Sequence, residues 1–501
     1  MKIKQNSYVW WIAATIVVIV GFLLNSGNTP FLKMNVWDDT NGMLSVGNAW
    51  LHGMIPYRDI FEQRGPVLFF IYMIAAALPG NNYFGIFILE ALNVLILLMV
   101  FRKIGRTIYP EWSRVADFAT ALSFATLLFV SRAYQLGGAP EEFMLVPLSV
   151  AVLVSVRVLY KAPISKWLWT VLGISFGIVF WTKFTIVGTF IALFLVAALF
   201  MRGFKKWIIA GFFTGLGYSI ISAFVVIYFK INHGLYMLYK IYFEMNMTAY
   251  QVKFNDAMDH VFASFNVIYS TFGYAFLWVI PYFFTIKSVK AQDKNKLGVI
   301  SLFGFISTTF AMSYGVKIFP YGLLAMLPIV MLQIILIVGA IKFSTHSTLL
   351  KFAVPVAVML LAVPPLANQN KDLYEETYTR GLGPIAKYIE KQKGEKTLLE
   401  PSFLDSGLFN LADIVPSTYY FDRINVTRQK YPEMYDGLWD SISNQRTRYV
   451  LISHKTDWTT KGNPSLKAEK KWLHGLDFDY LKYYKVAYYQ PHSAYVLLER
   501  R

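Results

Sequence analysis

The chain has 501 residues, of which 56% are hydrophobic and only 15% are charged, whereas soluble domains carry about 25% charged residues, so it is predicted to be an integral membrane protein. This composition excludes a cytosolic enzyme and a disordered scaffold, and the absence of cysteine excludes thiol catalysis, disulfides and zinc-thiolate sites. The net charge of +17 fits basic loops at the inner membrane face better than a nucleic-acid partner.

Apolar runs that can span a bilayer recur over residues 1–366 and predict an all-α polytopic membrane domain. About eleven such runs are found. They cover residues 8–24, 83–101, 115–130, 143–160, 167–181, 184–200, 207–229, 265–286, 297–313, 319–341 and 348–366. A shorter apolar run at 66–79 (PVLFFIYMIAAALP) is predicted to form a re-entrant or interfacial helix.

The basic start MKIK and the loop charges set the predicted orientation in the cell membrane. With a cytoplasmic N-terminus, every inner loop carries lysine or arginine, which is the positive-inside pattern. An odd number of spans then places the polar tail, residues 367–501, outside. One amphipathic stretch (GPIAKYIEKQK) and three β-rich runs (RYVLISH, YYKVAYYQ and SAYVLLER) predict a small extracytoplasmic α/β domain there.

The first outer loop, residues 25–82, is rich in acids and bases. Its length and its aromatic content predict a structured segment with juxtamembrane helices. Asp38 and Asp39, in VWDDTNGM, are candidates for a general base or for ligands of a divalent cation. The alternative is that one of them caps the start of a helix, and for an isolated pair that capping role is favoured.

A second acidic pair, Glu141 and Glu142 in QLGGAPEEFMLVP, is predicted at the outer mouth of a span. These two acids alone would be explained by the dipole of a helix N-terminus. Two acidic pairs on one face are more informative than either pair alone. We therefore expect them to flank one site, where one pair supplies the base and the other a metal ligand or a hydrogen-bond acceptor.

Basic residues on the outer face run against the inner-loop bias and are therefore candidates for a functional site. Phosphate is their natural partner, because arginine offers a bidentate fork and lysine a compact charge. The alternative for each is that the side chain extends to the lipid headgroups. These cations are Arg58, Arg64, Lys183 and Lys317.

The order and the shared outer placement of these motifs resemble the polytopic GT-C glycosyltransferases, especially bacterial members related to protein O-mannosyltransferases and aminoarabinose lipid A transferases. The motifs are VWDDTNGM, GMIPYRDIFEQRGPVLFFIY, GGAPEEFMLVP, FGIVFWTKFT and GVKIFPYGLLAMLP, all in the membrane half of the chain. Two features depart from the family pattern. The first acidic pair is Asp-Asp where Asp-Glu is commoner, and Pro320 precedes Tyr321 where relatives often have histidine.

The resemblance implies a GT-C fold and transfer of a sugar from a polyprenyl-phosphate carrier to an acceptor at the outer face. The acceptor would be a glycan, a teichoic acid, a lipid or a protein. A divalent metal ion held by Asp38 and Glu141 is compatible with this chemistry. The implied roles are catalytic carboxylate for Asp38, second acid for Glu141 or Glu142, and donor phosphate binding for Arg58, Arg64, Lys183, Lys317 and Tyr321.

Two other functions remain open at this stage. A lipid-linked sugar transporter or flippase would share the basic outer groove but would not need two acidic pairs. A polysaccharide polymerase or ligase would use the same lipid-linked sugar.

Overall fold

A computed structural model describes residues 7–79, 82–130, 134, 136–249, 253–272, 291–313, 319–340, 381–454 and 462–501. The chain divides into two compact units. The first unit comprises Met1–Thr29, Phe87–Ile227 and Val252–Asn370, and the second comprises Pro30–Ile86, Tyr228–Gln251 and Lys371–Arg501. The predicted span 348–366 lies outside the described residues, as does the second half of 265–286.

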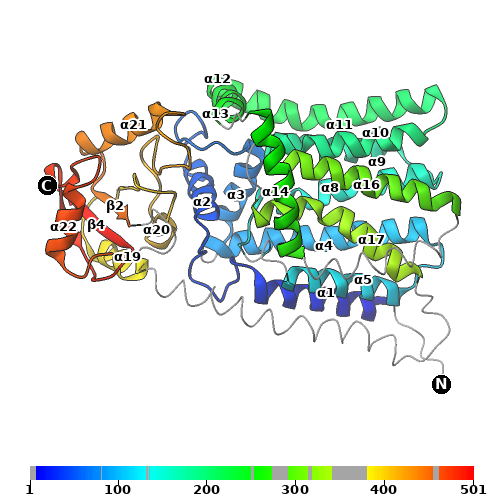
Figure 1. The fold of residues 1–501 in the computed structure, drawn as a ribbon, viewed down its shortest axis with the longest axis horizontal. Coiled ribbons are helices and arrows are strands. Elements are labelled where there is room, and N and C mark those ends of the chain that lie inside the picture. Colours follow the sequence, from blue (N-terminus) through cyan, green and yellow to red (C-terminus); the bar gives the residue numbers. More distant parts are fainter. Residues whose placement is uncertain are drawn as a thin grey trace. The chain divides into compact units, whose positions relative to one another are not determined.

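The first unit is helical, as expected where backbone groups must pair without water. Its long helices run side by side, and α14 crosses them (Figure 1). They are α1 (Ser7–Asn25), α4 (Asn82–Ile108), α5 (Arg114–Val130), α7 (Pro140–Phe143), α8 (Leu145–Leu159), α9 (Lys166–Thr182), α10 (Val187–Phe200), α11 (Phe204–Ile231), α14 (Phe254–Phe272), α16 (Ala291–Ser313) and α17 (Leu327–Ala340). Two 3₁₀ segments, η1 (Phe184–Ile186) and η5 (Pro320–Met326), precede α10 and α17.

Four stretches of the described residues are long and apolar enough to cross a membrane, namely Tyr83–Ile108, Pro140–Leu159, Phe204–Ile231 and Tyr321–Gly339. The stretch Pro140–Leu159 buries 89% of its apolar window, whereas Phe204–Ile231 buries only 17%. An apolar helix with so little cover fits a lipid environment, so the composition-based prediction of a multi-pass membrane protein is supported. The expected count of about eleven spans stays a prediction.

The helix expected at 265–286 begins earlier than predicted, at Phe254. Its first residues, FNDAMDH, mix acids with apolar side chains, so they do not form an apolar run. The pattern they follow is that of an amphipathic helix, in which only one face is apolar.

Helices α9 and α11 approach each other closely because glycine lies at their contact. A Cβ atom added to Gly173 would lie 1.9 Å from the carbonyl oxygen of Thr214, and one added to Gly217 would lie 2.1 Å from that of Thr170. Small residues at such positions let two backbones pack directly, which is the usual way that membrane helices gain contact.

The second unit contains a four-stranded sheet in the order β1-β2-β4-β3, with β1 parallel to β2 and the other pairs antiparallel. Its strands are β1 (Leu398–Leu399), β2 (Tyr449–Ser453), β3 (Tyr484–Tyr488) and β4 (Tyr495–Arg500). Its helices, which include a π-helix η2, are α2 (Asp38–Leu51), α3 (Pro66–Ala77), α12 (Leu235–Leu238), η2 (Tyr239–Met245), α13 (Asn246–Ala249), α19 (Leu382–Lys391), α20 (Leu408–Leu411), α21 (Pro432–Ser443), α22 (Leu466–His474) and the 3₁₀ turn η6 (Tyr480–Lys482).

The helix and strands predicted for residues 367–501 are confirmed where the structure describes them. The three β-rich runs form β2, β3 and β4, and the amphipathic stretch forms α19. The two middle strands bury their apolar side chains, as the relative burial along β2 and β4 shows. The C-terminal region is therefore a small mixed α/β fold, as expected.

Helix α3 confirms the helix expected at 66–79, and Pro66 takes the first helical position, where a missing N–H costs nothing. Helix α2 packs against α3, because a Cβ atom on Gly47 would lie only 2.5 Å from the carbonyl carbon of Tyr72. The capping role considered for Asp38 or Asp39 is wrong. The N-cap residue is Trp37, and both acids lie in the first turn, where the helix dipole favours negative charge.

Candidate active site

The first turn of α2 holds two carboxylates in different surroundings. Asp38 is 1% exposed, whereas 15% of the Asp39 side chain is exposed. Arg64 Nη2 lies 2.8 Å from Asp39 Oδ1, and Arg64 Nη1 lies 2.6 Å from Glu62 Oε2. Successive helical residues point about 100° apart, so Asp38 and Asp39 face different neighbours. Arg64 thus bridges Asp39 to Glu62, an acid that the sequence reasoning missed.

Arg58, the other cation of this loop, is already paired along the chain. Its guanidinium donates to both carboxylate oxygens of Asp59 at 2.8 and 2.6 Å and to the carbonyl oxygen of Asn232 at 2.6 Å. The hydrogen bond from Arg58 lowers the pKa of Asp59 below its usual range. The Arg58 side chain is 37% exposed, so its guanidinium group is accessible to a ligand as it stands.

Three further acids of the second unit lie buried behind α2. Burial raises the pKa of Asp405 to about 7, against the hydrogen bond that Ser45 donates to it. Burial and the nearby Asp405 carboxylate raise the pKa values of Glu400 and Asp422 well above their usual range. One weak signal for two of them is visible in the sequence, since Asp405 and Asp422 each directly follow apolar or aromatic residues in SFLDSGLF and YYFDRIN.

In the first unit, Lys183 pairs with one member of the second acidic motif. Lys183 ends α9, and its Nζ lies 2.5 Å from Glu141 Oε1. Glu141 is fully buried, whereas the Lys183 side chain is 37% exposed. A buried carboxylate needs a partner of opposite charge. Lys183 is thus held by a specific ion pair with a buried carboxylate.

The motif GVKIFPYGLLAMLP also contacts α7, the helix that carries Glu141. Helix α7, which carries Glu141, contacts η5, and Tyr321 lies in η5. The Tyr321 ring stacks on Phe319 with their centroids 5.6 Å apart. Lys317, the remaining candidate of this motif, lies outside the described residues. The first unit therefore brings together α7, Lys183 and the segment with Tyr321.

Glu142 faces a different partner, the membrane carboxyl of Glu90. The backbone N–H of Gly138 donates to Glu90 Oε1 and, at 3.1 Å, to Glu142 Oε2. Ser26 and Asn28 also donate to Glu90, at 3.1 and 3.0 Å. This pair of buried carboxyl groups therefore shares the Gly138 N–H as a donor. It fixes the turn that precedes Glu141.

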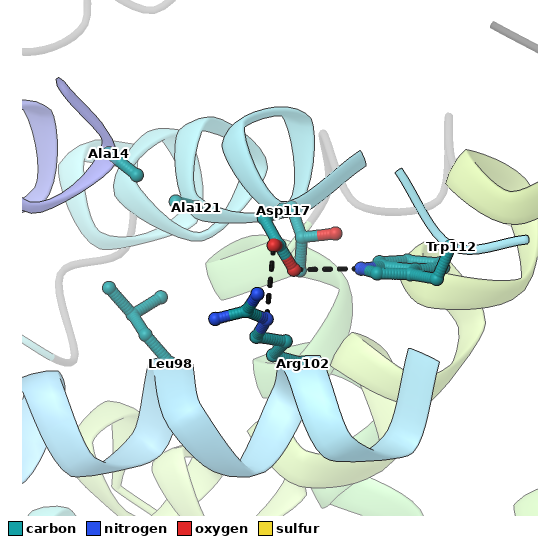
Figure 2. Close-up of a pocket in the computed structure, with 7 residues that line it drawn as sticks. Ala14, Leu98, Arg102, Trp112, Asp117 and Ala121 are labelled. Carbon is teal, nitrogen blue, oxygen red and sulfur yellow. Dashed lines mark hydrogen bonds and ion pairs between the residues drawn. The ribbon is translucent and has the colours of Figure 1, made fainter. Parts of the chain in front are cut away.

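A pocket between α1, α4 and α5 contains an ion pair. Arg102 Nε lies 3.2 Å from Asp117 Oδ2, and the indole of Trp112 donates to Asp117 Oδ1 at 2.8 Å (Figure 2). The ion pair offsets the two opposite charges, and the Trp112 indole adds a hydrogen bond to the Asp117 carboxylate. The pocket is lined by Ala14, Leu98, Arg102, Trp112, Asp117, Thr120 and Ala121.

A divalent metal ion held by Asp38 and Glu141 was considered above, and the described residues can be searched for such a site. Among them, no group of three or more histidine, cysteine, aspartate or glutamate side chains is arranged to hold a metal ion.

No protein-family model and no curated protein sequence matches the chain. Its fold is nevertheless similar to that of solved ArnT structures, so the resemblance suggested by the motifs is confirmed for the fold. The apo state of ArnT from Cupriavidus metallidurans matches with a TM-score of 0.63 and 12% identity, over 98% of each chain. The same protein bound to undecaprenyl phosphate matches with a TM-score of 0.56 and 11% identity, over 98% of this chain and 97% of that one.

Proposed function

We propose that the protein is a membrane glycosyltransferase that moves a sugar from a polyprenyl-phosphate carrier to an envelope acceptor. The observation that carries this proposal is the fold match to ArnT over almost the whole of both chains. One of the matching structures holds undecaprenyl phosphate, which is the lipid part of such a carrier. The acids and cations expected from the motifs add the chemistry that the transfer requires.

The acceptor hydroxyl is a poor nucleophile, so its proton must be removed as it attacks. We assign this step to Asp38, with Asp39 as the alternative. The acceptor oxygen forms a bond to the anomeric carbon, the bond from that carbon to the phosphate oxygen breaks, and the polyprenyl phosphate leaves with the electron pair. The abstracted proton stays on the aspartate until solvent takes it up.

The leaving phosphate carries negative charge and needs stabilisation by cations. We assign Lys183 to it first, because its ammonium group is paired with Glu141 while 37% of the side chain is exposed. Arg58, Arg64 and Lys317, together with the Tyr321 hydroxyl, are further candidates for binding the donor. Glu141 keeps Lys183 oriented, and Glu142 supports Glu141 through the turn at Gly138.

The test is transfer by the purified protein in lipid nanodiscs, supplied with undecaprenyl-phosphate-linked sugars. Mass spectrometry of envelope polymers from cells with and without the gene identifies which sugar and acceptor to supply. We expect release of undecaprenyl phosphate together with a glycosylated acceptor. Movement of the intact lipid-linked sugar across the bilayer, with no new glycosidic bond, would instead establish a flippase.

We further propose that residues 367–501 form an extracytoplasmic domain and that the N-terminus is cytoplasmic. The chain has no native cysteine, so a single introduced thiol reports its own location. Lys467 is exposed in α22 and suits this purpose. A membrane-impermeant maleimide should label Lys467→Cys in intact cells. Labelling only after the cells are opened would reverse the orientation.

A further inference from the structure

The face of α2 that carries Asp38 is docked against the C-terminal part of the chain. Asp38, Asn41 and Ser45 are spaced by three and four residues, so they share one face of the helix. That face is buried, since all three residues are at most 1% exposed. Asp39 lies on the neighbouring face with Arg64. The position of Asp38 therefore depends on what α2 is docked against.

Its partner is the loop that leads into α20. Ser45 Oγ donates to Asp405 Oδ2 at 2.5 Å, although the two residues are 360 positions apart. Helix α20 contacts α2, and Asn410 donates to Ser45 Oγ and to the Asn41 carbonyl oxygen, both at 3.4 Å. These contacts join the loop to the middle of the α2 face.

The loop is shaped for this contact. Gly407 has a φ of 95°, and a Cβ atom there would lie 2.9 Å from Asn41 Nδ2, so any other residue would be strained and would crowd α2. Asp405 Oδ1 accepts from the Gly407 N–H at 2.7 Å, and the Asp405 N–H donates to Asp422 Oδ2 at 3.0 Å. Asp405 therefore holds both the turn of its own loop and the hydroxyl of Ser45.

We propose that Asp405 is a positioning residue, which fixes α2 through Ser45 and so sets where the Asp38 carboxylate lies. The catalytic part of this inference rests on the proposed function. The structural part, that a C-terminal residue immobilises α2, does not depend on it. Asp405 acts here as a hydrogen-bond acceptor, so its charge as such is not required.

The chemistry of the side chains suggests which variants separate these roles. Ser45→Ala removes the donor and leaves Asp405 in place. Asp405→Ala removes the acceptor and also frees the Gly407 N–H. Asp405→Asn keeps a polar group opposite Ser45, because its amide nitrogen can donate to the hydroxyl oxygen. Asp436→Ala is the matched control, since Asp436 is an exposed acid of the same part of the chain.

The first measurement is hydrogen exchange of backbone amides in the full-length protein, and it needs no substrate. We expect faster exchange in α2 for Ser45→Ala and Asp405→Ala, and wild-type exchange for Asp405→Asn and Asp436→Ala. Exchange that stays at the wild-type level in α2 of Ser45→Ala would overturn the proposal. So would an equal acceleration through α19, α21 and the sheet, because that is general destabilisation.

The second measurement is sugar transfer. A small displacement of a catalytic group can cost about a hundredfold in rate, so Ser45→Ala should lower kcat by about 10- to 100-fold while KM for the lipid donor stays unchanged. The double variant Ser45→Ala/Asp405→Ala should have a kcat no lower than that of Asp405→Ala alone, because both changes remove the same hydrogen bond. Wild-type kcat in Ser45→Ala, or full additivity, would refute the positioning role. If the wild-type protein transfers nothing, the proposed function fails while the exchange result still decides whether Asp405 fixes α2.

Discussion

Arg64 and Lys183 are both cations of the same motif set, yet the two units hold them differently. Arg64 is 18% exposed and bridges Asp39 and Glu62 with two separate nitrogens. Lys183 is 37% exposed and forms an ion pair with the buried Glu141. A guanidinium locked between two acids orients them, whereas an ammonium with one contact can turn toward a phosphate. We therefore expect Arg64 to affect the chemical step and Lys183 to affect donor binding.

The largest effect on the rate of sugar transfer is expected from a substitution in α2, the helix that Arg64 contacts through Asp39. Asp38→Asn removes the proposed base while keeping its size, and positioned proton abstraction is worth about a hundred- to ten-thousandfold in rate. We expect kcat for sugar transfer to fall by that amount, with Asp39→Asn less severe. Full activity of purified Asp38→Asn with the lipid donor would contradict the assignment.

Lys183→Gln tests the expectation that Lys183 affects donor binding. Losing a charged hydrogen bond to phosphate costs about 1.5 to 3 kcal/mol, so KM for the lipid donor should rise by roughly ten- to hundredfold. Lys166→Gln is the control, because Lys166 is an exposed lysine at the opposite end of α9. Wild-type donor kinetics in the Gln variants of Lys183, Arg58 and Arg64, all folded, would instead favour anchoring in headgroups.

Arg64→Lys distinguishes an orienting role from a binding role. Lysine keeps the charge but cannot bridge Asp39 and Glu62 as a fork does. We expect kcat to fall by roughly tenfold with little change in the donor KM, since a hydrogen bond to a charged group contributes about 1.5 to 3 kcal/mol and the lysine retains part of it. A rise in KM without a change in kcat would place Arg64 with Lys183 in donor binding.

The last expected effect is on stability and not on the rate of transfer. Asp405 has a pKa of about 7 in the folded chain, against about 3.9 for an unperturbed aspartate. Between these values the folded form keeps a proton that the unfolded form releases, so stability falls as pH rises from about 4 to about 7. The full loss is at most about 4 kcal/mol, at 1.36 kcal/mol per pKa unit. Tm from tryptophan fluorescence should therefore be higher at pH 5 than at pH 8.

Asp405→Asn removes this titration, so it should narrow the difference in Tm between the two pH values. Glu400 and Asp422, whose pKa values are also raised, keep part of the difference in the variant. An identical difference in Tm for the variant and the wild-type protein would show that Asp405 does not titrate in this range.

The local elements followed from the sequence because their causes are local. Apolar runs without water must form helices, so α1, α4, α8 and α17 were expected near their observed places. Short runs rich in β-branched, aromatic and other apolar residues likewise predicted β2 and β4. The chemical types of the candidate site residues were also visible, since acids and cations on an outer loop stand out in so apolar a chain.

Which groups meet was decided only by the tertiary structure. Lys183 and Glu141 are 42 positions apart, and nothing local to either one selects the other. Asp405 reaches Ser45 only because the C-terminal loop folds back on α2, and Glu62 joins Asp39 only through Arg64. A sequence determines helices and strands through interactions among near neighbours. Burial, and with it the shifted pKa values and the ion pairs, depends on segments that only the folded chain brings into contact.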